Sequence, residues 1–269
     1  MTVLYLVPDF ETVSACDLKK CGAWRYAEDI TTSILTLRWA YGEDGRVGIW
    51  HPGDPFPFAD EIAAGYMFTA HNTGFEKAIW RCHMMPVYGW PDLPDKQWDD
   101  TLARCANLNI PQDLDTAVRV LRLPAQKDTE ASKMVIGLSK YDKHGNHAEI
   151  TPDILRMVDE YCADDCRAQK GLRERVGTLS PQERQIWLLD QRINERGVRL
   201  DMDLVDKMQK VVDDATIPLV AEFQEITGGL KLASPKLKQW CHDRSVNSLP
   251  KSGITQRNRC ANQERLISA

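Results

Sequence analysis

Two acidic side chains near the start of the chain stand at a spacing that suits metal binding. Val3 to Val7 is apolar and β-favouring, which predicts a short buried strand. Asp9 and Glu11 follow at its end, and residues two apart in an extended chain point to the same side. Adjacent carboxylates repel each other unless a cation lies between them, and carboxylates suit hard ions such as Mg²⁺ and Mn²⁺. The simpler alternative is two hydrated acids in a turn.

Two later stretches offer further acids. Glu76 falls in the first turn of a helix predicted to begin at Phe75, directly after a short apolar strand. Tyr161 and Asp165 are four residues apart in a long predicted helix, so they share one face, whereas Asp164 is turned away by about 100°. Each stretch alone is commonplace. Four acids in this order, each at an expected position in its element, are much more specific for a metal site.

The elements that must position these acids change in kind along the chain. Strands are predicted early, at residues 3–7, 34–41, 46–50 and 66–70. Helices dominate after residue 74, at residues 75–84, 101–108, 114–123, 132–138 and 151–175. Only helices are expected after residue 180, at residues 181–197, 203–227 and 235–240. We therefore predict an α/β domain over residues 1–178, an all-helical extension over residues 179–248 and a polar tail over residues 249–269.

Composition and charge narrow the class of protein. The 269 residues carry a net charge of −5, and the negative charge is concentrated before residue 178. An acidic first part argues against a broad basic DNA-binding surface there, but it suits a site that gathers carboxylates around metal ions. No apolar run approaches the ~20 residues of a membrane span and no secretion signal is recognisable, which predicts a cytosolic protein without a membrane partner. Cys162 and Cys166 are interpreted, like the other cysteines, as reduced thiols packed in the core.

The motifs together resemble those of the 3′–5′ exonucleases that use four acidic metal ligands and a tyrosine, the DEDDy type. The three motifs are matched by Asp9-Phe10-Glu11, by Asn-Thr-Gly-Phe-Glu at residues 72–76, and by Tyr161 with Asp165. Flanking stretches resemble the proofreading domain of phage-type family A DNA polymerases, at residues 17–20, 26–29, 98–101 and 187–194. This resemblance implies a ribonuclease H-like exonuclease fold, a mixed central sheet flanked by helices. It also implies that residues 179–248 correspond to the start of a polymerase thumb.

The resemblance further implies a set of metal ligands. Two divalent ions, Mg²⁺ or Mn²⁺, would be held by Asp9, Glu11, Glu76 and Asp165. Asp9 would bridge the two ions, and Tyr161 would orient the attacking water. The second motif usually ends in Asp, so Glu76 must reach its metal with one more methylene group.

Substrate contacts are expected from residues beside the acids: Phe10, Thr12, His71, Asn72 and Phe75. The rings of Phe10 and Phe75 would stack on terminal bases, or else pack in the core. Asn72 would touch substrate, or else cap the helix that follows it.

Three functions remain open at this point. The leading one is a 3′–5′ exonuclease that releases mononucleotides from single-stranded or frayed 3′ ends of DNA, in a bacterial or phage-infected cell. The alternatives are an exoribonuclease similar to ribonuclease D, and a catalytically weak binding or structural remnant of a truncated family A polymerase. No polymerase palm motif follows, so the chain is not expected to polymerise DNA by itself. The apolar faces of the helices at residues 203–227 and 235–244 predict a polymerase partner or self-association.

Overall fold

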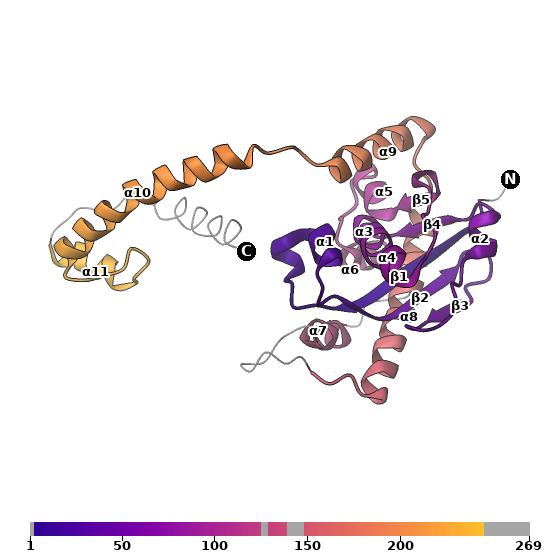
Figure 1. Ribbon diagram of the computed structural model, residues 1–269. Helices are drawn as coiled ribbons and strands as arrows, with labels where there is room; N and C mark the ends of the chain where they lie inside the picture. The colour runs from indigo at the N-terminus through magenta and orange to yellow at the C-terminus, as the bar shows by residue number, and fades with distance from the viewer. Residues whose placement is uncertain (1–2, 125–128, 139–147, 245–269) are drawn as a thin grey trace. The chain divides into compact units, whose positions relative to one another are not determined.

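The computed structural model describes residues 3–124, 129–138 and 148–244 (Figure 1). The chain divides into two compact units, Met1–Glu195 and Arg196–Ala269, and each unit is described by itself. In the second unit, the described residues form helices α10 (Met202–Thr227) and α11 (Lys236–Asp243). The polar tail predicted over residues 249–269 lies outside the described residues.

A mixed five-stranded sheet forms the centre of the first unit (Figure 1). Its strands lie in the order β3-β2-β1-β4-β5. β1 pairs antiparallel with β2 and parallel with β4, while β2–β3 is antiparallel and β4–β5 parallel. The strand bounds are Tyr5–Val13, Ser33–Tyr41, Val47–Trp50, Met67–Ala70 and Trp98–Asp100. The α/β class is confirmed, and the arrangement is consistent with the predicted ribonuclease H-like fold.

Helices flank this sheet and account for most of the remaining described chain. Their bounds are α1 Leu18–Glu28, α2 Ala59–Ala63, α3 Gly74–Ile79, α4 Met85–Tyr88, α5 Thr101–Asn107, α6 Leu114–Val120, α7 Thr129–Leu138, α8 Pro152–Val176 and α9 Pro181–Arg196, with a π-helical turn η1 at Trp80–Met84 and a 3₁₀ turn η2 at Asp95–Gln97. The single helix predicted over residues 75–84 is therefore two pieces, α3 and η1, and α4 follows directly after them. α8 begins as predicted, with Thr151 Oγ1 accepting from the Ile154 amide at 3.3 Å.

β1 is longer than predicted and carries both acids inside it. Pro8 does not end the strand but stays in register opposite Trp39. Leu4 O accepts from the Met67 amide and Tyr5 O from the Gly42 amide, so the backbone groups of even-numbered residues face β4. Pairing with β4 stops at Leu6, so Pro8 lies where no amide is needed on that side.

The two faces of β1 meet different surroundings. Leu6 and Phe10 point into the main core, where the rings of Trp80 and Trp90 pack with their centroids 4.8 Å apart. The odd-numbered residues point to the opposite face, which α8 covers. Val13 there belongs to a second apolar cluster with residues of β2, α7 and α8. The alternation of the strand therefore directs Asp9 and Glu11 toward α8.

α9 is anchored to the first unit by buried charges and by a tryptophan. Lys77 is 1% exposed and pairs with Asp95 at 3.2 Å and with Glu195 near the end of α9. Arg81 contacts the same Glu195 at 2.7 Å. Trp187 packs within the main core. The ion pairs of Glu195 and the packing of Trp187 thus fix α9 to the part of the chain that contains the sheet.

Candidate metal and active site

Asp9, Glu11 and Cys162 place their potential metal-binding atoms within 4.8 Å of one another. The two acids are half-buried in β1, and Cys162 is fully buried on the facing side of α8. A β-bulge follows directly, because the β1–β2 register shifts between Glu11 and Thr12. Bulges redirect side chains and are frequent beside active sites. The predicted pair of carboxylates therefore converges, and it does so with a thiol that the sequence analysis assigned to core packing alone.

Two side chains of α8 fix the carboxylate of Asp9. Gln169 Nε2 donates to Asp9 Oδ1 at 2.8 Å, and the Cys162 thiol donates to Asp9 Oδ2 at 3.3 Å. Gln169 Oε1 also accepts from the backbone amide of His71 at 2.8 Å, so one amide group links β1, α8 and the end of β4. Burial, then a hydrogen bond with Cys166 and the charges of Asp9 and Glu11, raise the pKa of Cys162, which keeps the thiol protonated and able to donate.

Tyr161 and Asp165 share the sheet-facing side of α8, as predicted. Both are buried, whereas the intervening Asp164 is exposed and pairs with Arg167 at 2.5 Å. Burial, then the charge of Asp165, and more weakly that of Glu11, raise the pKa of Tyr161. The phenol therefore stays protonated at any working pH and lies within electrostatic range of both carboxylates.

Glu76 lies in the first turn of α3, as predicted, and is only 5% exposed. Its Oε2 atom has no hydrogen-bond partner among the described residues. Burial raises the pKa of Glu76 well above its usual range, and the neighbouring charges of Asp9 and Asp100 raise it further. Ionising a buried carboxyl that lacks a hydrogen-bond donor and lies near a second carboxylate costs free energy when no cation is bound. Such a group is suited to coordinate a cation. The donor set around Asp9 therefore fits a hard divalent metal ion.

Asp100 is a buried acid that the sequence analysis did not select for the site. It ends β5 and accepts from the Asn72 amide at 3.0 Å and from the Leu102 amide at 2.8 Å. Burial, more than the nearby charge of Asp99, raises its pKa to about 6. Its position in a Trp-Asp-Asp segment could have indicated a capping role, because an acid before a helix is a common N-cap. Asp100 holds the loop that carries Asn72, beside Glu76.

The predicted substrate-binding residues divide into buried and accessible positions. Phe10 is 4% exposed and packs near Trp90, so its ring is a core residue with no face open to a base. Both ring nitrogens of His71 are engaged, Nδ1 with Thr101 Oγ1 at 3.0 Å and Nε2 with Gln112 O at 2.7 Å. Thr12 lies 2.8 Å from the hydroxyl of Tyr26. His71 and Thr12 therefore make hydrogen bonds within the protein.

Asn72 and Phe75 are the more accessible members of that set. Phe75 is half-buried, with its ring 6.1 Å from that of Tyr26. Asn72 is exposed and has a left-handed backbone, with φ 74°. The alternative of a capping Asn72 is wrong, because α3 has Thr73 at its N-cap and no side-chain capping bond. Both residues precede Glu76 in the same short segment of the chain, residues 72–76.

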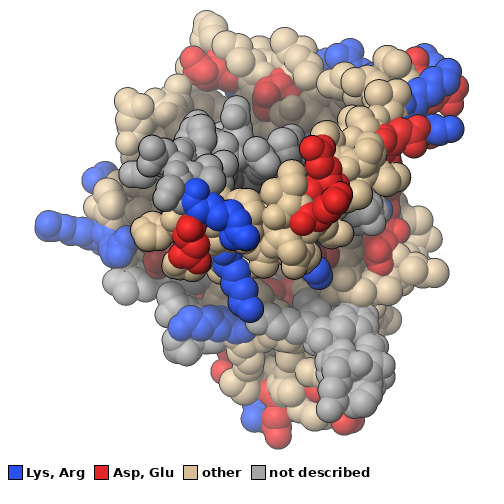
Figure 2. Space-filling model, turned by 90° about the vertical axis from the view of Figure 1, so that its left-hand side faces the viewer, with Lys and Arg blue, Asp and Glu red and all other residues tan. Residues whose placement is uncertain are grey.

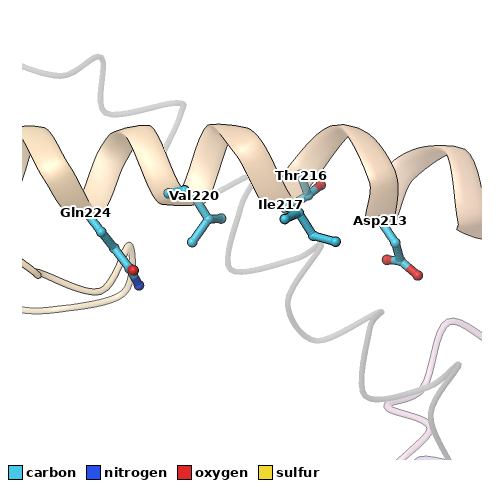
Figure 3. Close-up of a pocket in the computed structure, with 6 residues that line it drawn as sticks. Asp213, Thr216, Ile217, Val220 and Gln224 are labelled. Carbon is cyan, nitrogen blue, oxygen red and sulfur yellow. The ribbon is translucent and has the colours of Figure 1, made fainter.

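Charged side chains of both signs are mixed over the described surface drawn in Figure 2. That face shows no uniformly basic area among the residues that the structure describes. A pocket on α10 is lined by aliphatic and polar side chains, with Asp213 as its single acid, and Figure 3 shows Thr216, Ile217, Val220 and Gln224 beside it. This lining lacks a pair of titratable groups, unlike the cluster at Asp9. No described helix is long and apolar enough to cross a membrane.

Comparison with known proteins finds a similarity to a DNA polymerase. No protein-family model and no solved structure matches it. The chain is similar to a DNA polymerase of Bacillus phage SP02, with 28% identity over 268 residues. That match covers 92% of this chain and 40% of the phage polymerase, so the chain spans less than half the length of this relative. The chain is thus related to a part of a phage DNA polymerase.

Proposed function

We propose that the chain is a metal-dependent 3′–5′ exonuclease that hydrolyses DNA phosphodiester bonds and releases mononucleotides. The observation that carries the proposal is the convergence of Asp9 and Glu11, near enough to the buried Glu76 for the charge of Asp9 to raise the pKa of Glu76, whose Oε2 atom has no hydrogen-bond partner among the described residues. Asp9 and Glu11 lie in β1 beyond its pairing with the parallel strand β4, and Glu76 comes after the carboxyl end of β4. The carboxyl end of parallel strands is the usual location of ligand sites in such sheets. The similarity to a phage DNA polymerase favours DNA over RNA as substrate, and the interior of an infected bacterium as its location.

The acids supply the ligands that this reaction needs. Asp9, Glu11, Glu76 and Asp165 are the residues we assign to two Mg²⁺ or Mn²⁺ ions. Bound there, such ions lower the pKa of the attacking water and stabilise the charge on the leaving 3′ oxygen.

Other residues of the chain position these groups. Gln169 holds Asp9 Oδ1 at 2.8 Å and so sets the direction of its second oxygen. Tyr161, kept neutral by its burial, donates its hydroxyl proton in a hydrogen bond that orients the water or a phosphate oxygen. Asn72 and Phe75 flank Glu76 and are assigned to the terminal nucleotide. An unpaired end reaches these groups more easily than a duplex, so single-stranded or frayed 3′ ends are the proposed substrate.

We assign this activity to residues 1–178, with α9 as structural support. The helical extension of residues 179–248 is proposed to contact a polymerase or a second copy through α10 and α11. The exposed side chains of Met208, Val211 and Leu219 on α10 support this assignment.

The activity is tested by degradation of a 5′-labelled single-stranded DNA oligonucleotide with Mn²⁺ or Mg²⁺. We expect a ladder that shortens from the 3′ end, that EDTA abolishes and that Asp165→Asn abolishes. Asp164→Asn is the matched control, because the neighbouring acid is exposed and faces away. An RNA oligonucleotide of the same sequence tests the ribonuclease alternative. Absence of cleavage by a folded preparation with either metal would favour the catalytically weak remnant.

A further inference from the structure

We propose that Cys162 turns the acidic cluster into a binding site for a soft divalent cation such as Zn²⁺, with Asp9 and Glu11 as its oxygen ligands. Zn²⁺ bound there competes with Mg²⁺ or Mn²⁺ for Asp9 and so inhibits hydrolysis. The inhibition rests on the proposed exonuclease function, whereas the binding site itself does not. Thiolate ligands favour zinc strongly over magnesium, so one cysteine changes which metals the site accepts.

The spacing of the three ligand atoms fits a tetrahedral zinc ion. Zinc binds cysteine sulfur at about 2.3 Å and carboxylate oxygen at about 2.1 Å, so sulfur and oxygen ligands on one ion lie about 3.6 Å apart. The Cys162 sulfur lies 3.3 Å from Asp9 Oδ2, and the three ligand atoms fall within 4.8 Å of one another. For Cys162 and Asp9, an ion can therefore replace the thiol hydrogen bond with a movement of a few tenths of an ångström.

A second, independent observation points to a cation at this place. Glu76 is 5% exposed, its Oε2 atom lacks a donor among the described residues, and its carboxyl senses the charge of Asp9. Buried carboxyl oxygens in native proteins normally have a hydrogen-bond or metal partner. A cation held by the cluster would therefore also offset the cost of burying the nearby Glu76 carboxylate.

The binding step is a proton-for-metal exchange. The S–H bond of Cys162 breaks, its proton passes to the buffer, and a sulfur–zinc bond forms without any change of oxidation state. Asp9 and Glu11 contribute oxygen lone pairs only. Zinc binding to the cluster therefore releases the thiol proton of Cys162, which the Cys162→Ser variant has no thiol to release.

Cys166 provides a matched control on the same helix. It lies one turn after Cys162, is also 0% exposed, and does not belong to the group of three close ligand atoms. A Cys166→Ser variant therefore introduces the same polar change into the same buried face of α8. Only the Cys162→Ser variant removes a ligand from the proposed site.

The test is titration of the full metal-free chain with Zn²⁺ and with Co²⁺, which reports thiolate ligation by a charge-transfer band in the near ultraviolet. We expect the wild type and Cys166→Ser to show this band and to release more protons on zinc binding than Cys162→Ser does, measured by calorimetry in two buffers of different ionisation enthalpy. Cys162→Ser should lack the band and bind zinc at least about tenfold more weakly. Near-ultraviolet circular dichroism checks that each variant is folded.

The outcomes separate this inference from the proposed function. An equal charge-transfer band in Cys162→Ser, or no zinc binding by the wild type, would overturn the inference even if the chain degrades DNA. A band that depends on Cys162 in a chain without nuclease activity would support the metal site and overturn the exonuclease. If both hold, zinc should inhibit the wild type at concentrations at least tenfold below those that inhibit Cys162→Ser.

Discussion

Replacing Glu76 with Gln should stabilise the metal-free protein at neutral pH while it weakens metal binding. The carboxyl is buried, one of its oxygens lacks a donor among the described residues, and its pKa is raised well above the ordinary value of 4.5. A carboxyl whose pKa is raised on folding holds more protons in the folded state than in the unfolded one. Stability of the metal-free protein therefore falls as pH rises above about 4.5, until the folded carboxyl ionises.

The size of this effect has an upper limit that does not depend on how far the pKa is raised. Between the pKa of Glu76 in the unfolded state and its higher pKa in the folded state, each pH unit lowers the free energy of unfolding by about 1.36 kcal/mol. At pH 7 the cost attributable to Glu76 is therefore at most about 3.4 kcal/mol, and at pH 5 at most about 0.7 kcal/mol. Glutamine cannot ionise, so the advantage of the Glu76→Gln variant should grow by up to about 2.7 kcal/mol between these pH values.

Denaturant unfolding in EDTA at pH 5, 6 and 7 measures this difference directly. Subtracting the wild-type free energy of unfolding from that of the variant removes the contributions of other acids, such as Asp100. Addition of Mn²⁺ at pH 7 should then stabilise the wild type more than the variant, because the ion binds the ionised carboxylate of the folded state. Parallel stability–pH curves for the two proteins, with equal gains from Mn²⁺, would refute the assignment of Glu76 as a buried metal ligand.

Three further substitutions test other contacts. Gln169→Leu should lower nuclease turnover about 10–100-fold because it releases the Asp9 carboxylate, and should cost about 1–3 kcal/mol of stability because the His71 amide loses its acceptor. Unchanged turnover of the folded variant would remove Gln169 from the site. Lys77→Met should lower the free energy of unfolding by about 1–3 kcal/mol, since Glu195 loses one of its two cationic partners, and denaturant titration measures it. Asn72→Gly should leave thermal stability nearly unchanged, whereas Asn72→Val should cost about 1–2 kcal/mol, because the backbone at position 72 has a positive φ that valine adopts only with strain. Equal losses of stability in the two variants would contradict the left-handed conformation.

Local sequence patterns were sufficient for the fold class and for the faces of the main elements. The pairing of Tyr161 with Asp165, and the outward position of Asp164, follow from helical periodicity alone. The first turn of α3 at Glu76 follows from the change of pattern after the apolar residues of β4. These features depend on neighbours within one or two turns of the same element, which is the range that a sequence pattern reports.

Features that depend on tertiary contacts could not be predicted. β1 was predicted to end before Pro8, since the departure of β4 after Leu6 is not visible in the local sequence. β5 was missed because Trp98–Asp100 is three residues long and ends in two acids, whose burial depends on arginines elsewhere in the chain and on loop amides. Cys162 was correctly expected to be buried, but its contact with Asp9 spans 153 positions in the sequence. Helical spacing shows which residues share a face and does not identify what that face meets.

Pro8 has a consequence for the backbone of β1 where this strand runs past its neighbour. Beyond Leu6, one side of β1 lacks a strand partner among the described residues, although the strand continues to Val13. Pro8 and Phe10 are buried there, so an amide hydrogen on that side would be a buried donor without a strand acceptor. Proline carries no amide hydrogen and so removes the first such donor. The same residue thus saves the protein the free energy of one unsatisfied buried donor beside the acidic cluster.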